Sequence, residues 1–140
     1  MSNMIQQTTR PQNLADVAVD AAAGCPFGVL VREFLDYFAS LTSDVARATS
    51  LMTAPAILNG RVPGGAMMDA YLAAVAEKLS WDRHMETPEW AYGSERFLSE
   101  PWFAASDTPG LRPLLLLESP VMFRRRNLFV SINALERARR

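Results

Sequence analysis

The sequence predicts a mainly α-helical fold, a compact bundle of about five to six helices with an irregular, aromatic-rich segment and at most one short strand. Apolar residues recur at helical spacing in separate stretches, and residues that cap or end helices lie between them. The long break in this pattern, residues 82–113, is rich in proline and aromatic residues. We expect residues 1–12 to form a flexible arm and residues 13–140 a single α-helical domain, because a chain of this length can bury a core without disulfides or metals.

The first three helices are predicted from their apolar faces and from the residues that bound them. Asn13 is a good N-cap for the first helix, which ends at Gly24. The second helix is indicated by a continuous apolar face, formed by Leu30, Phe34, Tyr37, Phe38 and Leu41. Ser43 and its neighbours cap a third helix that extends to about Met52, before Pro55.

The clearest internal loop is residues 59–65, where glycine, proline and asparagine precede a fourth helix. This helix, residues 66–81, is predicted from an apolar stripe formed by Met68, Tyr71, Leu72, Val75 and Leu79. Asp69, Glu77 and Lys78 lie outside that stripe, so we expect them on another side of the helix.

Residues 82–113 are expected to form an ordered wrap around the helices, because a disordered linker would not need so many aromatic residues. The anchoring residues would be Trp81, Trp90, Tyr92, Phe97, Trp102 and Phe103. A short helix is expected from about Ser94 to Leu98.

The C-terminal part begins with a run of four leucines, residues 114–117, in a predicted helix over residues 111–118. We expect this helix to be buried nearly all round, since the run would otherwise expose apolar surface. Ser119 and Pro120 resemble an N-cap and a first helical residue. Residues 128–132 have the composition of a strand, and Asn133 and Glu136 resemble the capping box of a closing helix.

Charge is distributed unevenly along the chain. Residues 1–118 carry 14 acidic and 8 basic side chains, about −6, whereas residues 119–140 carry six arginines and one glutamate, about +5. Three of these arginines are consecutive and lie between two apolar clusters. The predicted partner-binding residues are therefore Phe123, Arg124, Arg125, Arg126, Leu128 and Phe129.

Three other interpretations of the same residues stay open. The arginines are also suited to solvation, to ion pairs with acidic residues of this chain, or to nucleic-acid phosphates. The net acidic chain disfavours nucleic acid, which is bound by basic residues spread over a surface. The apolar residues Leu128, Phe129, Val130 and Ile132 would ordinarily belong to a core.

Residue patterns that support catalysis or cofactor binding are weak in this sequence. Cys25 is the single cysteine, and His84, between Asp82 and Glu86, is the single histidine, so we expect neither a metal site nor an activated nucleophile. Glu33 is expected on a solvated, salt-bridged helix face. We expect no enzyme activity and no cofactor. The polar N-terminal residues favour a cytoplasmic protein without a membrane anchor.

Several short motifs in the second half of the chain carry a family resemblance. They are residues 69–79, 88–90, 96–98, 101–103, 111–113 and 118–130. Together they resemble a group of small bacterial α-helical proteins that are encoded beside nucleotidyltransferase toxins of the abortive-infection type. The resemblance implies an antitoxin that masks the active site of its toxin, with Arg124 to Arg126 able to occupy a pocket for nucleotide phosphates. It supplies no defined functional residues, and the chain has no recognisable DNA-binding helix-turn-helix.

The sequence thus favours a non-enzymatic protein that binds another protein, with the antitoxin as its most specific form. Self-association as a homodimer is a competing interpretation. A small nucleic-acid-binding regulatory module that uses the C-terminal arginines is the first alternative. A small-ligand-binding helical bundle is the second, and it would need a pocket lined by Tyr71, Trp81 or Trp90 with a titratable group inside.

Overall fold

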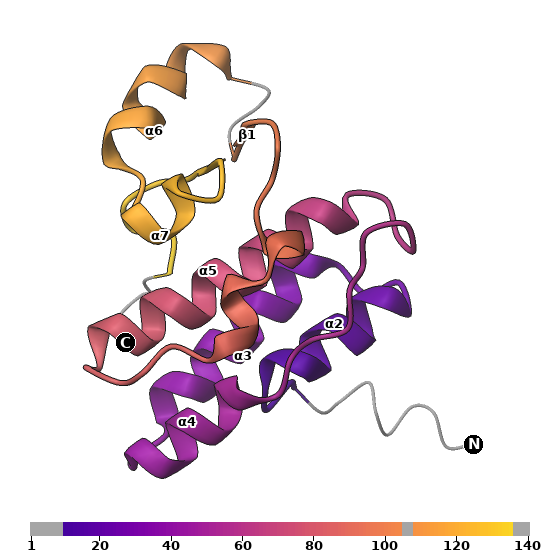
Figure 1. Ribbon diagram of the computed structural model, residues 1–140, viewed down its shortest axis with the longest axis vertical. Coiled ribbons are helices and arrows are strands. Elements are labelled where there is room, and N and C mark those ends of the chain that lie inside the picture. The colour runs from indigo at the N-terminus through magenta and orange to yellow at the C-terminus, as the bar shows by residue number, and fades with distance from the viewer. Residues whose placement is uncertain (1–9, 105–107, 136–140) are drawn as a thin grey trace.

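The computed structural model describes residues 10–104 and 108–135, and the described chain is mainly helical, as the sequence predicts (Figure 1). Helix α5 passes through the middle of the molecule. Helices α2, α3 and α4 lie on one side of it, and α6, α7 and strand β1 lie on the other (Figure 1). Residues 1–9 of the expected flexible arm lie outside the described residues, while Pro11, within that arm, is buried.

The first three predicted helices are confirmed as α2 (Leu14–Ala22), α3 (Phe27–Ser40) and α4 (Asp44–Met52). The Asn13 side chain accepts a hydrogen bond of 2.8 Å from the backbone N–H three residues later, and the Ser43 hydroxyl does the same at 3.1 Å. The apolar faces of α2 and α3 form much of the core. Their buried residues are Leu14, Val17, Ala18, Ala21, Leu30, Val31, Phe34, Leu35 and Phe38.

The fourth predicted helix is α5 (Gly65–Asp82), which follows the predicted loop. It is buried on most of its circumference, and its small side chains allow neighbouring segments to approach closely. These buried small residues are Ala70, Ala73, Ala74 and Ala76. At Gly65 a β-carbon would lie only 2.1 Å from the carbonyl oxygen of Leu58, so the start of the helix requires glycine.

The expected wrap crosses α5 as two short 3-10 helices, η1 (Glu89–Tyr92) and η2 (Ser94–Arg96). The second of these is the short helix expected in this region. Trp90 anchors the wrap, because its indole N–H donates a hydrogen bond of 2.9 Å to the carbonyl of Leu51 in α4. Trp81 does not serve as an anchor, since it is largely exposed on α5.

The C-terminal part contains a small parallel sheet. Strand β1 (Trp102–Phe103) pairs with β2 (Leu128–Phe129), with Trp102 opposite Leu128. The rings of Phe103 and Phe129 stack with their centroids 5.0 Å apart. The predicted strand is therefore present but ends at Phe129, before Ile132.

Three short helices lie between the two strands: η3 (Pro109–Leu111), α6 (Arg112–Glu118) and α7 (Val121–Arg124). The predicted capping role of Ser119 is wrong. Its hydroxyl instead donates to Leu115 O at 2.6 Å and accepts from the backbone N–H of Val130 at 2.8 Å, joining α6 to the segment after β2. Pro120 is the N-cap of α7 and not its first residue.

The closing helix predicted after Asn133 falls mostly outside the described residues. Asn133 lies in a turn, and Glu136, its expected partner in a capping box, lies outside the described residues.

Candidate functional site

The three consecutive arginines do not share one surface. Because successive residues of a helix point about 100° apart, the short helix α7 directs them to different sides. Arg124 is exposed, the Arg125 side chain is about half exposed (51%), and Arg126 is fully buried. Arg126, one of the predicted partner-binding residues, therefore does not lie on the surface of this conformation.

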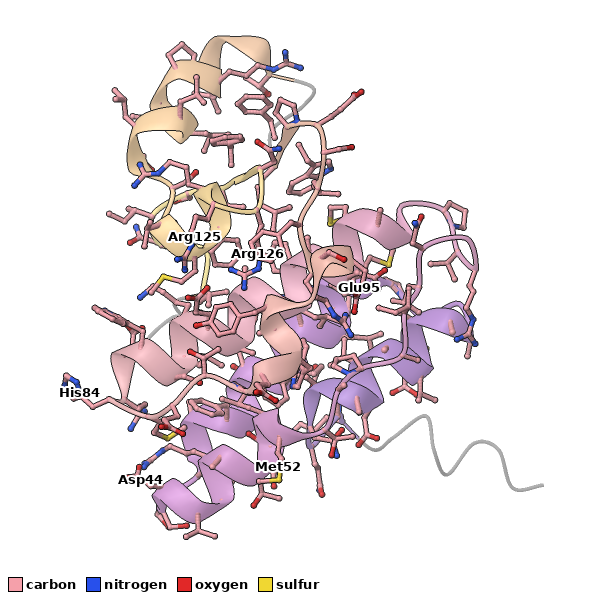
Figure 2. All side chains as sticks on the ribbon, in the orientation of Figure 1. Asp44, Met52, His84, Glu95, Arg125 and Arg126 are labelled. Atoms are coloured by element: carbon pink, nitrogen blue, oxygen red, sulfur yellow. The ribbon has the colours of Figure 1, made fainter. Side chains whose placement is uncertain are left out.

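Arg126 connects three segments of the chain from the interior. Its Nη1 donates to Glu77 Oε1 on α5 at 2.6 Å and to Met122 O at 2.8 Å. Its Nη2 donates to Ala91 O of η1 at 2.8 Å. The guanidinium carbon also lies 4.6 Å from the ring centroid of Phe97. Figure 2 shows Arg125 and Arg126 between α7 and α5.

Glu77 forms ion pairs with both Arg126 and Arg125. Its Oε2 accepts hydrogen bonds from Arg125 and, at 3.1 Å, from the hydroxyl of Tyr92. Burial by itself would raise the pKa of Glu77, but the hydrogen bonds and charges of Arg126 and Arg125 outweigh it and lower the pKa. Pairing with acidic residues of the same chain, one of the interpretations left open by the sequence, thus holds for Arg125 and Arg126.

A second buried cluster lies nearer the start of α5, around Asp69. Its carboxylate accepts hydrogen bonds from the backbone N–H groups of Leu58 at 2.8 Å and Asn59 at 3.0 Å. One carboxylate oxygen lies 3.9 Å from Nη1 of Arg96 in η2. Asp69 therefore fixes both the loop before α5 and the wrap that crosses it.

Arg96 resembles Arg126 in its surroundings. Its Nη2 donates to Pro55 O at 2.6 Å, and its guanidinium carbon lies 4.8 Å from the ring centroid of Trp90. Burial lowers the pKa of Arg96, and the charges of Asp69 and Glu95 oppose only part of that shift. Arginine keeps its charge under such conditions, so both buried pairs are ionic.

These two pairs are the features that sequence reasoning missed. Asp69 and Glu77 were expected away from the apolar stripe, yet both are buried and face later segments of the chain. A signal was present, because most other positions of this helix are alanine or larger apolar residues. A helix that is apolar nearly all round is buried, and its acidic residues then require buried cationic partners.

The apolar residues of the predicted partner-binding site belong to the core of this chain. Phe123, Leu128 and Phe129 are all buried. The ring of Phe123 packs edge-on against Tyr71, at 5.1 Å between centroids, while β1 covers Leu128 and Phe129. In this conformation these three side chains are not exposed for contact with a partner.

The leucine run, in contrast, carries several exposed apolar side chains. Leu115 alone of the four leucines is buried, so the expectation of a helix buried nearly all round is wrong. Helix α6 lies at one end of the molecule (Figure 1). We call its exposed leucine side chains, with Leu111 just before the helix, the α6 leucine face. It comprises Leu111, Leu114, Leu116 and Leu117, which are 42 to 81% exposed.

Other chemically reactive residues lie apart from these clusters. His84 is exposed just beyond α5 (Figure 2), in a left-handed backbone conformation (φ 56°). Cys25 is an exposed free thiol. Within the described residues, no three histidine, cysteine, aspartate or glutamate side chains gather closely enough to hold a metal ion. None of the helices described is both long and apolar enough to cross a membrane.

Comparison with known proteins leaves the chain without an assigned family. No protein-family model matches it, and neither a curated protein nor a solved structure does. The functional argument therefore rests on the residues of this chain.

Proposed function

We propose that this chain is a non-enzymatic protein that binds another protein through the α6 leucine face. The observation that carries the proposal is the exposure of three leucines on the seven-residue helix α6 and of Leu111 just before it, with Leu117 at 81%. Single exposed apolar residues are ordinary on soluble proteins, but a contiguous apolar patch usually marks an interaction surface.

The charges beside this face suggest the chemistry of the partner. Arg112 and Arg124 are exposed, and Val121, which is 48% exposed, lies three residues before Arg124 on α7. An exposed apolar helix that begins with an arginine, Arg112, suits a partner surface that is apolar with an acidic rim. The net positive charge of this end of the chain would also accelerate association with such a partner.

The more specific form of the proposal is an antitoxin that masks a nucleotidyltransferase-like toxin. It is supported by the sequence resemblance and by Arg124, which has no ion pair within the described part of the chain. Because Arg126 is committed to Glu77, contacts with a phosphate pocket would fall to Arg124, assisted by Arg125. In this form of the proposal, the α6 leucine face would supply most of the affinity for the toxin, and Arg124 would orient the antitoxin at the toxin's active site.

Binding to nucleic acid is supported less well. Proteins that neutralise the nucleic-acid backbone commonly use about 6–10 phosphate contacts. The arginine triplet offers only two side chains with exposed guanidinium surface, and one of these already pairs with Glu77. A protein partner therefore remains the better explanation of this end of the molecule.

The test is affinity purification of the tagged protein from its native host at moderate salt, with protein and nucleic acid quantified in the same eluate. The variant Leu114→Lys/Leu117→Lys removes the leucine face. Val45→Lys is the matched control, because Val45 is also highly exposed but lies on α4. We expect one stoichiometric protein with the wild type and the control, and its loss from the leucine variant.

The other outcomes decide against the proposal in identifiable ways. A partner retained by the leucine variant would place the binding surface elsewhere. Light scattering that gives a dimer for the wild type and a monomer for the leucine variant would identify a second copy as the occupant. Nucleic acid that is lost only from an Arg124→Glu variant would favour the regulatory module. Recovery of a nucleotidyltransferase whose activity the wild type inhibits would support the antitoxin.

A further inference from the structure

A groove of about 420 Å³ lies between α3 and α5. It shares no lining residue with the α6 leucine face. Its volume falls in the range of small-molecule sites, which are mostly apolar with a few polar groups. Its apolar lining comes from α3, α5, β1 and the C-terminal segment, and comprises Phe27, Val31, Leu35, Met67, Tyr71, Trp102 and Ala134. Among the aromatic residues for which the sequence suggested a ligand pocket, Tyr71 therefore lines one.

The lining of the groove is held in place by the core. The Tyr71 ring packs edge-on between Phe27, at 5.7 Å, and Phe123, at 5.1 Å. Val31 and Leu35 are buried and form the floor, whereas Phe27 and Trp102 are half-buried. A ligand that entered would find these side chains already ordered, which reduces the entropic cost of binding.

Among the described residues that line the groove, Arg32 of α3 is the one charged side chain. Arg32 is exposed and forms no ion pair with any acidic residue that the structure describes. Its guanidinium extends back along the helix over Gly28, where a β-carbon would have a single neighbour within 4 Å, Arg32 Nη1 at 3.9 Å. The space above Gly28 is thus open beneath an unpaired cation.

We infer that this groove binds a small amphipathic carboxylate, with the apolar body of the ligand against Tyr71 and Trp102 and its carboxylate on Arg32. An apolar lining with a single cation at one side selects a molecule that is apolar over most of its length and negative at one end. A planar guanidinium matches a carboxylate through two parallel hydrogen bonds. The site is independent of the α6 leucine face, so it extends the function beyond protein binding.

The test is calorimetric titration of the full chain with dodecanoate, below the concentration at which this probe forms micelles. Gly28→Leu adds apolar bulk inside the groove, and its β-carbon would meet one neighbour within 4 Å, Arg32 Nη1. Arg32→Gln removes the charge, with Arg61→Gln as the control for loss of an exposed arginine elsewhere. The protein with Leu114→Lys/Leu117→Lys controls for adsorption of the probe to the leucine face.

We expect saturable binding at one site in the wild type, the Arg61 control and the leucine variant. Arg32→Gln should weaken binding by about fivefold, the scale of an exposed ion pair. Gly28→Leu should abolish binding while its urea midpoint stays at or above that of the wild type. The inference is overturned if the wild type shows no saturable binding, if Gly28→Leu binds as the wild type does, or if the leucine variant loses binding. Equal affinity for dodecanol and dodecanoate would overturn the choice of a carboxylate.

Discussion

Replacing Arg126 by methionine should destabilise the protein severely, although the sequence predicts that the arginine triplet lies on a contact surface. Methionine keeps much of the apolar length of the arginine but removes its charge and every hydrogen bond. The carbonyl groups of Met122 and Ala91 would lose their donor, and Glu77 would keep Arg125 and Tyr92. A buried polar group left without its hydrogen-bond partner typically costs about 1–3 kcal/mol. The substitution leaves two such carbonyl groups, so we expect a loss of about 2–6 kcal/mol. That is a large part of the total stability of about 5–15 kcal/mol for a domain.

The assay is urea unfolding followed by far-ultraviolet circular dichroism, with Arg124→Met as the matched control. Arg124 is exposed, so its substitution should change stability by no more than about 0.5 kcal/mol. A double-mutant cycle with Glu77→Gln should give a coupling energy of at least about 1 kcal/mol, because the two side chains are in direct contact. If Arg126→Met unfolds at the same urea concentration as Arg124→Met, the buried pair does not hold α7 against α5. Interface experiments should accordingly use Arg124→Glu, since any substitution of Arg126 would confound binding with folding.

Three further predictions concern stability. The pKa of Glu77 is lower in the folded protein than its ordinary value of 4.5, so the ionised carboxylate stabilises the fold above about pH 4.5. That stability is lost as the pH falls through the folded pKa. The urea midpoint of the wild type should therefore decline below about pH 4.5, and the midpoint of Glu77→Gln should decline less. Gly65→Ala should lower the stability measured by thermal unfolding by about 1–3 kcal/mol or more, because the added methyl group would overlap a backbone carbonyl. Gly110→Ala is the control, since a β-carbon there has open space and should leave stability unchanged. Equal melting temperatures for the two variants would contradict this reasoning. Leu115→Ala should cost about 2–5 kcal/mol and Leu117→Ala less than about 0.5 kcal/mol in urea unfolding, and similar losses would show that the leucine face is packed.

The helices of the first half could be predicted because their signals are local. Asn13 and Ser43 cap helices within three residues, and the apolar face of α3 repeats at helical spacing. The aromatic wrap was also predictable in outline, since Trp90 needs both burial and a hydrogen-bond acceptor. The sequence could not identify Leu51 as that acceptor, because it lies 39 residues away.

The candidate site was predicted less well because its partners are distant along the chain. Glu77 and Arg126 are 49 residues apart, and no local pattern connects them. The opposite error occurred at the leucine run, where composition suggested complete burial. Burial depends on how many elements surround a helix, and the short α6 lies at one end of the molecule (Figure 1). Of its four leucines, Leu115 alone is buried.

The two acidic residues of α5 have a consequence for the order in which the chain can acquire its structure. Asp69 and Glu77 are synthesised well before Arg96 and Arg126, their cationic partners. Until Arg126 has left the ribosome, the carboxylate of Glu77 on α5 has no buried cationic partner. Burying this side of α5 at that stage would therefore cost free energy. A nascent chain that ends near residue 82 should therefore expose this side of α5 to water, and the apolar core beneath it should become closed only when synthesis is nearly complete.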